Sequence, residues 1–129
     1  MSQMHLMAKL GELRGETLRT PSGRKSFIVS RLENGRVTVT TSNESEVHVS
    51  VTGIQAVLDY LARHGHGREH PCPVKSSNPI ADAGPLCLAA REGKSQRKIT
   101  YVLPLLERLG LVGFDRSARA TAVFLVNRA

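Results

Sequence analysis

The sequence predicts an α+β fold. Residues 1–51 are expected to form an N-terminal helix and a small antiparallel β-meander, and residues 52–129 to alternate helices with short strands. Apolar residues recur at helical spacing in residues 3–14, alternate with polar residues from Glu16 to Val51, and return to helical spacing after Thr52. Asn34-Gly35 is a strong hairpin signal, because both central positions of a type I′ turn need positive φ. The 129 residues suffice for one domain with a buried core, with or without a small extension.

The first half begins with an amphipathic helix at residues 3–14, whose apolar stripe consists of Leu6, Met7, Leu10 and Leu13. Strands are then expected at residues 17–20, 25–32, 36–41 and 46–51. In the last two, valines alternate with threonine, histidine and serine, so one face of the meander should be buried and the other hydrated.

The second half begins with a helix for which Thr52 and Gln55 fit a capping box, and which should end near His64-Gly65. Asn78 followed by Pro79 fits the start of another helix. The elements expected between residues 52 and 95 are a helix at 52–64, a very short strand at 73–75, a helix from 78 that is interrupted at Gly84-Pro85 and resumes over 86–92, and a turn at 93–95.

The next helix is expected to run from Ser95, a natural N-cap, to Gly110, which can adopt the left-handed conformation of a helix end. Pro104 lacks an amide donor, which predicts a kink or a break into two helices. The buried stripe is predicted to consist of Ile99, Val102, Leu103, Leu106 and Leu109. Two strands, 111–115 and 121–126, should follow as a hairpin whose connection carries Arg116 and Arg119.

This C-terminal stretch has a helix with a donor-rich leading face, the run Leu-Glu-Arg-Leu-Gly-Leu-Val at 106–112, and a hairpin with arginines at its tip. Over residues 95–126 it resembles the recognition helix and wing of winged helix-turn-helix proteins, such as the multiple-antibiotic-resistance and arsenical repressor families. The resemblance implies that residues 52–129 form a winged helix-turn-helix domain whose helix enters the major groove and whose wing reaches the backbone or minor groove. Carried over by position, the DNA-binding residues would be Lys94, Ser95, Gln96, Arg97, Lys98, Thr100, Tyr101, Arg116 and Arg119.

The charge of the chain favours a polyanionic partner. Its formal net charge is +7 and its isoelectric point is near 10.1, and residues 64–129 hold 10 basic residues against 5 acidic ones. With the resemblance, this predicts sequence-selective binding of double-stranded DNA by a transcriptional regulator or DNA-targeting module, with no cofactor. In that interpretation, Arg97 would bind guanine and Gln96 adenine.

Other interpretations of the same residues stay open. The basic helix face can be merely solvated, and a winged helix can serve as a protein-interaction module that does not bind DNA. The open edge or exposed face of the meander is a candidate surface for a homodimer.

Two groups of residues have side chains suited to a metal site or to a nuclease site. His64, His66, His70 and Cys72 lie within nine residues and have zinc-binding side chains, but no second ligand pair completes the set, so no metal is expected. Asp82, Glu92 and Lys94 have the spacing of metal-dependent nucleases. In those enzymes the last two residues belong on a strand, whereas here they fall at a predicted helix end, so no enzyme is expected.

The cysteines and the hydropathy predict the compartment. Cys72 and Cys87 are too few for a disulfide framework and are expected to be reduced, and Cys87 should be a small buried apolar residue. No apolar run is long enough to cross a bilayer, and the first ten residues lack the apolar core of a secretion signal. The expected location is the cytoplasm, or the nucleoid if the source is prokaryotic.

Overall fold

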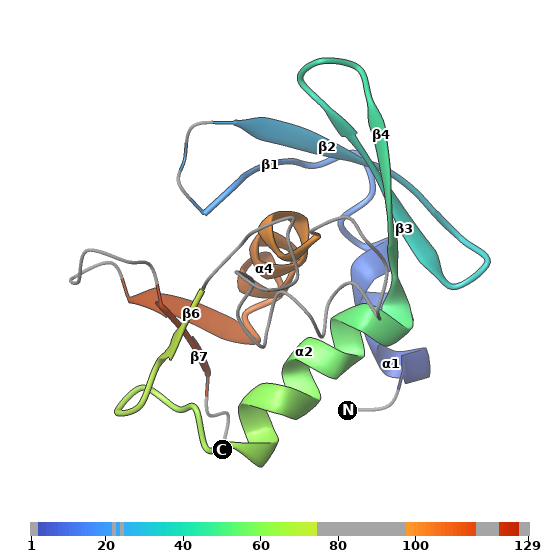
Figure 1. The fold of residues 1–129 in the computed structure, drawn as a ribbon. Coiled ribbons are helices and arrows are strands. Elements are labelled where there is room, and N and C mark those ends of the chain that lie inside the picture. Colours follow the sequence, from blue (N-terminus) through green and yellow to red (C-terminus); the bar gives the residue numbers. More distant parts are fainter. Residues whose placement is uncertain (1–2, 22, 24, 75–97, 116–121, 127–129) are drawn as a thin grey trace, which may run out of the picture.

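The structure is a computed structural model that describes residues 3–21, 23, 25–74, 98–115 and 122–126. These residues form helices and antiparallel sheets, so the predicted α+β class is confirmed (Figure 1). The helix expected from Asn78, its interruption at Gly84-Pro85, the segment 86–92 and the turn at 93–95 lie outside the described residues.

The first part of the chain is a short helix and a four-stranded meander. Helix α1 (Gln3–Gly11) is shorter than predicted, because the chain continues in turns to Glu16, although Leu13 stays buried. Asn34 and Gly35 have φ values of 53° and 71°, so the predicted hairpin turn is confirmed. The strands lie in sequence order in one antiparallel sheet: β1 (Thr17–Arg19), β2 (Ser26–Glu33), β3 (Arg36–Thr41) and β4 (Glu46–Ser50).

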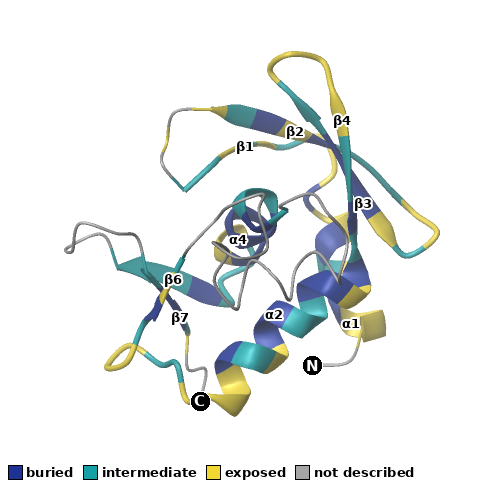
Figure 2. Cartoon of the chain, viewed as in Figure 1, coloured by how far each residue is buried: buried dark blue, intermediate teal, exposed yellow. Residues whose placement is uncertain are grey.

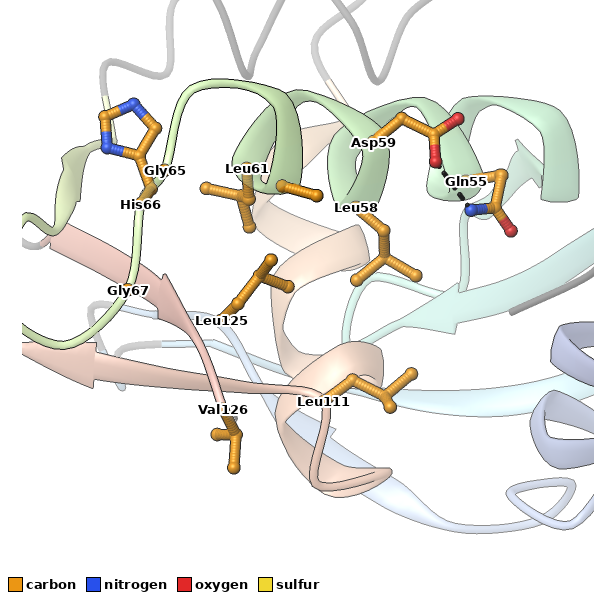
Figure 3. A pocket seen from close by; sticks show the side chains of 11 residues that line it. Gln55, Leu58, Asp59, Leu61, Gly65, His66, Gly67, Leu111, Leu125 and Val126 are labelled. Atoms are coloured by element: carbon orange, nitrogen blue, oxygen red, sulfur yellow. Dashed lines mark hydrogen bonds between the residues drawn. The ribbon is translucent and has the colours of Figure 1, made fainter. Parts of the chain in front are cut away.

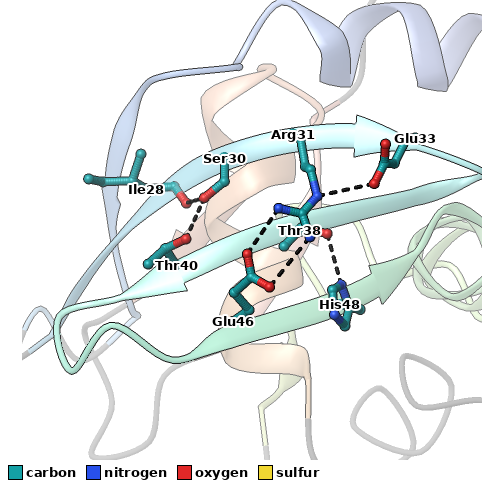
Figure 4. A network of polar contacts seen from close by, with 8 residues as sticks. All are labelled: Ile28, Ser30, Arg31, Glu33, Thr38, Thr40, Glu46 and His48. Carbon is teal, nitrogen blue, oxygen red and sulfur yellow. Dashed lines mark hydrogen bonds and ion pairs between the residues drawn. The ribbon is translucent and has the colours of Figure 1, made fainter.

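The meander has one apolar and one polar face, as the alternation predicted. The inner face is buried and consists largely of Phe27, Val29, Val37, Val39 and Val49. On the outer face, Arg31 pairs with Glu46 at 3.0 Å, and Thr38 shares a 2.8 Å hydrogen bond with the Nδ1 atom of His48 (Figure 4). Thr38 is only 2% exposed although it lies on this face, so the outer polar side chains enclose one another.

Helix α2 (Val51–Arg63) follows β4 without a linker. Its N-cap is Ser50, whose hydroxyl accepts a 2.9 Å hydrogen bond from the amide of Gly53, so the predicted cap at Thr52 is wrong. The end of β4 explains why Ser50 and not Thr52 caps the helix. Ser50 is the last extended residue, and an N-cap residue needs an extended backbone to direct its hydroxyl at the first free amides of a helix. The predicted end is confirmed, since His64 is the C-cap and Gly65 has a φ of 66°.

The rest of the described chain forms one helix and a second sheet. Helix α4 (Ile99–Arg108) is followed by β6 (Val112–Asp115), and β6 pairs with β7 (Ala122–Leu125) in a ribbon. A two-residue strand, β5 (Cys72–Pro73), pairs with the other edge of β7, close to the short strand predicted at 73–75. The order β5-β7-β6 makes β7 the central strand.

Helix α4 lies at the centre of the molecule, between the meander and the layer formed by α2 and the ribbon (Figures 1 and 2). It is one helix with Pro104 inside it, so of the predicted kink or break the break does not occur, and Gly110 beyond it has a φ of 77°. Residues buried along α4 share a single core with α1, the meander, α2 and the ribbon, and this core is continuous across residues 51 and 52. The buried positions of α4 are Ile99, Val102, Leu103, Pro104, Leu105 and Leu106.

Candidate nucleic-acid interface

Three of the nine predicted DNA-binding residues are described by the structure: Lys98, Thr100 and Tyr101. The other six lie outside the described residues, and they are Lys94, Ser95, Gln96, Arg97, Arg116 and Arg119.

The helix expected to lead into a DNA groove begins later than predicted. Helix α4 starts at Ile99, and Lys98 is its N-cap, with no side-chain hydrogen bond that caps the helix. The predicted start at Ser95 is therefore wrong for this helix, and Ser95, Gln96 and Arg97 themselves lie outside the described residues. Hydrogen bonds from Tyr101 and Val102 to the carbonyl of Lys98 form the first turn, so the backbone fixes this start.

The side chain of Lys98 is directed at the meander. Its ammonium group donates a hydrogen bond to the backbone carbonyl of His48 in β4. This carbonyl lies on the side of β4 away from β3, at the open edge of the four-stranded sheet. Lys98 therefore covers part of the edge that was a candidate for dimerisation, as lysines commonly protect sheet edges.

Tyr101 is also directed at the meander. Its ring meets the ring of Phe27 edge to face, with centroids 5.3 Å apart and an interplanar angle of 82°, and it packs against the core. Edge-to-face contact is a favourable aromatic geometry, so the contact holds α4 on the inner face of β2. Lys98 and Tyr101 are predicted to lie on a DNA-facing surface. In these contacts, both side chains face the first half of the chain instead. Thr100, between them, is partly exposed.

Neither of these two partners of α4 is identifiable from the sequence. His48 lies among alternating residues of a strand, and Phe27 reads as an ordinary core residue. Both become relevant only because the meander folds over α4.

The net positive charge of the chain is unevenly divided. Residues described by the structure include 10 basic and 9 acidic ones, a balance of +1, whereas the remaining 36 residues hold 8 basic and 2 acidic ones, a balance of +6. The body of the fold is thus close to electroneutral. Most of the excess belongs to residues 75–97, on the N-terminal side of α4, and to residues 116–121, between β6 and β7.

The ribbon determines where the second of these segments is attached. Asp115 pairs with Ala122, so the connection that contains Arg116 and Arg119 begins and ends at directly opposed positions of two strands. At the other end of the ribbon, Val112 pairs with Leu125, close to the core.

The cluster proposed as a metal candidate is engaged in other contacts. His66 shares a 2.8 Å hydrogen bond with the carbonyl of His70 through Nδ1. The ring of His66 stacks with that of Tyr60 at a centroid distance of 5.9 Å, and the ring of His64 lies 4.3 Å from that of Tyr60. Cys72 is buried in the core, and burial raises the pKa of its thiol, which disfavours the thiolate that zinc requires. No group of three or more histidine, cysteine or carboxylate side chains within the described ranges could hold a metal ion.

The nuclease candidates Asp82, Glu92 and Lys94 lie outside the described residues, as does Cys87. Among the helices that the structure describes, none has the length and apolar character needed to cross a membrane. In comparisons with protein-family models, curated proteins and solved structures, nothing matches the chain.

Proposed function

We propose that the second half of the chain is a winged helix that binds double-stranded DNA, as a transcriptional regulator or as the DNA-targeting module of a larger system. The order of the sheet is the observation that carries this proposal. A short strand before α4 pairs with the second strand of a ribbon after α4, and this strand order supports a winged helix. In such a domain the connection of the ribbon is the wing.

The contacts of α4 change which residues are proposed to bind DNA. Because Lys98 and Tyr101 are held by the meander, the proposed contacts come from the basic segments that flank α4 and connect the ribbon. These are Lys94, Ser95, Gln96 and Arg97 before the helix, and Arg116 and Arg119 in the wing. Arginines bind phosphates and guanine edges well because the guanidinium group offers paired donors.

The test is electrophoretic retardation of a random-sequence duplex over a range of salt concentrations. Each phosphate contact releases condensed counterions, so replacing both Arg116 and Arg119 by alanine should flatten the log–log salt slope by roughly 2 if both contact phosphates. The matched control is the double variant Arg14→Ala and Arg36→Ala. It removes the same charge from two exposed positions of the first half of the chain. Equal losses of affinity in the two double variants would mean that only net charge matters, and would refute a wing contact.

Base selectivity needs a separate experiment. Arg97→Ala is expected to reduce the preference between duplex sequences selected from a random pool, whereas the wing variant should weaken binding to all of them alike. An unchanged preference in Arg97→Ala would remove this residue from the proposed base contacts.

The second candidate is a winged helix that binds a protein and not DNA. It is favoured by one observation, namely that the described flank of α4 already packs on the meander through Lys98 and Tyr101. This candidate predicts no salt-sensitive retardation at any duplex length.

A nuclease is a weaker alternative, which requires magnesium-dependent nicking that disappears in Glu92→Ala.

A homodimer is also proposed, through the outer face of the meander in preference to its edge. The edge at β4 is partly covered by Lys98, whereas the outer face presents Ile28, which is among the exposed large apolar side chains of the described residues. Ile28→Glu should therefore convert a dimer to a monomer in sedimentation equilibrium. A wild-type chain that sediments as a monomer at every concentration would end this proposal.

A further inference from the structure

A groove beside α2 has the composition of a small-molecule site. It has a volume of about 460 Å³ and lies between one side of α2, the turn after α4 and the end of β7 (Figure 3). This volume falls within the range of ligand pockets in proteins. Its apolar lining is provided mainly by Leu58, Leu61, Leu111, Leu125 and Val126.

The depth of the groove comes from the core. Leu61 is fully buried and Leu58 nearly so, while Val126 at the opening is exposed. An occupant would therefore bury an apolar body against side chains that already belong to the core. Figure 3 shows Leu58, Leu61, Leu111 and Leu125 directed toward the space between α2 and the ribbon.

Asp59 is the one carboxyl side chain in the described lining of the groove, which also includes the imidazole of His66. Gln55, one turn earlier on α2, donates a 2.9 Å hydrogen bond from its amide nitrogen to Oδ1 of Asp59 and so orients the carboxylate. Within the part of the chain that the structure describes, Asp59 forms no ion pair. Among the described residues, no donor reaches the enclosed amide oxygen of Gln55, so within this part of the chain both members of the pair keep unused acceptors.

These features select the chemistry of the occupant. A carboxylate that is held in place at an apolar groove, with neither lysine nor arginine in the lining, attracts a cation and repels an anion. The chain as a whole, with its net charge of +7, has the opposite long-range preference. Selectivity for a cation would therefore have to arise locally, at Asp59.

We propose that this groove binds a small organic cation, an amine with an aromatic or aliphatic body, whose ammonium group pairs with Asp59 and whose apolar part covers Leu58, Leu61 and Leu125. This site does not depend on DNA binding, because none of the proposed DNA-binding residues lines it.

The experiment uses three probes with the same phenyl body: 2-phenylethylammonium, 2-phenylethanol and 3-phenylpropanoate. Each is titrated into the ¹⁵N-labelled full chain, and amide shifts are followed by two-dimensional NMR. We expect shifts at Ala62, Gly65, Gly67 and Val126, and binding of the ammonium probe roughly threefold or more tighter than that of the alcohol, because an exposed ion pair contributes modestly. The carboxylate probe should bind weakest.

Two variants provide the controls. Asp59→Asn keeps an acceptor for Gln55 and the shape of the side chain, so it should abolish the preference for the ammonium probe while the alcohol still binds. Ala62→Phe places a ring in the groove and should block all three probes, whereas Ala8→Phe, at an exposed position of α1, should block none.

Three results would overturn the proposal. They are tighter binding of the carboxylate than of the ammonium probe, an ammonium preference that survives in Asp59→Asn, and shifts that lie outside the groove. Absence of binding by all three probes would equally refute it.

Discussion

Gly113 in β6 is predicted to be irreplaceable by alanine, because its strand partner fills the space above it. Gly113 lies opposite Phe124 in the ribbon, and a Cβ atom at Gly113 would stand 2.7 Å from Cζ and 2.9 Å from Cε2 of the Phe124 ring. Both distances are shorter than any ordinary carbon contact. The ring is only 7% exposed and lies beneath the guanidinium group of Arg68 at 5.1 Å, so it cannot move away freely.

The expected cost of Gly113→Ala is that of overpacking a buried contact, about 1–3 kcal/mol in the free energy of unfolding. The chain has no tryptophan, so urea denaturation is best followed by far-ultraviolet circular dichroism. Gly67→Ala is the matched control, because Gly67 has an ordinary φ and no atom within 4 Å of its added Cβ. It should change stability by less than about 0.5 kcal/mol.

A double variant identifies the cause. Replacing Phe124 by leucine removes the ring, so Gly113→Ala should cost at least about 1 kcal/mol less in that background than in the wild type. Strict additivity of the two substitutions would refute the steric argument.

Three further predictions concern contacts between distant parts of the chain. Lys98→Met keeps the aliphatic stem but removes the donor to the carbonyl of His48, so it should lower the free energy of unfolding by about 1 kcal/mol and alter DNA retardation little. A large loss of DNA affinity at unchanged stability would contradict the placement of Lys98 on the meander. Arg108→Ala removes the 2.9 Å ion pair with Glu16. Because the Arg108 side chain is 56% exposed, the free energy of unfolding should fall by less than about 1 kcal/mol, and by less still at high salt. A loss of stability that salt does not alter would contradict this expectation. Burial raises the pKa of the Cys72 thiol in the folded chain, so the stability that the neutral thiol contributes is complete below the ordinary thiol range and is lost as pH rises through the folded pKa. Urea titrations should show the free energy of unfolding falling over that pH range. The same slope in Cys72→Ala would refute this cause.

Features that depend on local backbone preference were predictable from the sequence. Asn34-Gly35 and Gly110 have the positive φ values that their residue types predict, and the alternation of β3 separates an apolar from a polar face, although Thr38 on the polar face is buried as well. The cap of α2 was missed by two residues, since Ser50 and Thr52 are both good caps and the end of β4 decides between them.

The environment of α4 could not be predicted from its own residues. The helical spacing of apolar residues predicted one buried stripe, but Pro104 and Leu105 are buried as well. The reason is that the helix is covered by the meander on one side and by α2 and the ribbon on the other. The partners of Lys98 and Tyr101 come from β4 and β2, which are far away in sequence. A helical face rich in donors therefore indicates polar surroundings without saying whether they are DNA, water or another part of the same chain.

The central position of β7 has a consequence for the order of folding. Both neighbours of this strand, β5 and β6, precede it along the chain, and among the described strands β5 pairs with β7 alone. Until Ala122–Leu125 has been synthesised, Cys72 and Pro73 lack this partner, and the apolar surface under them stays open. Formation of this sheet is thus a late, long-range event, and a nascent chain that stalls before β7 would be a natural substrate for chaperones.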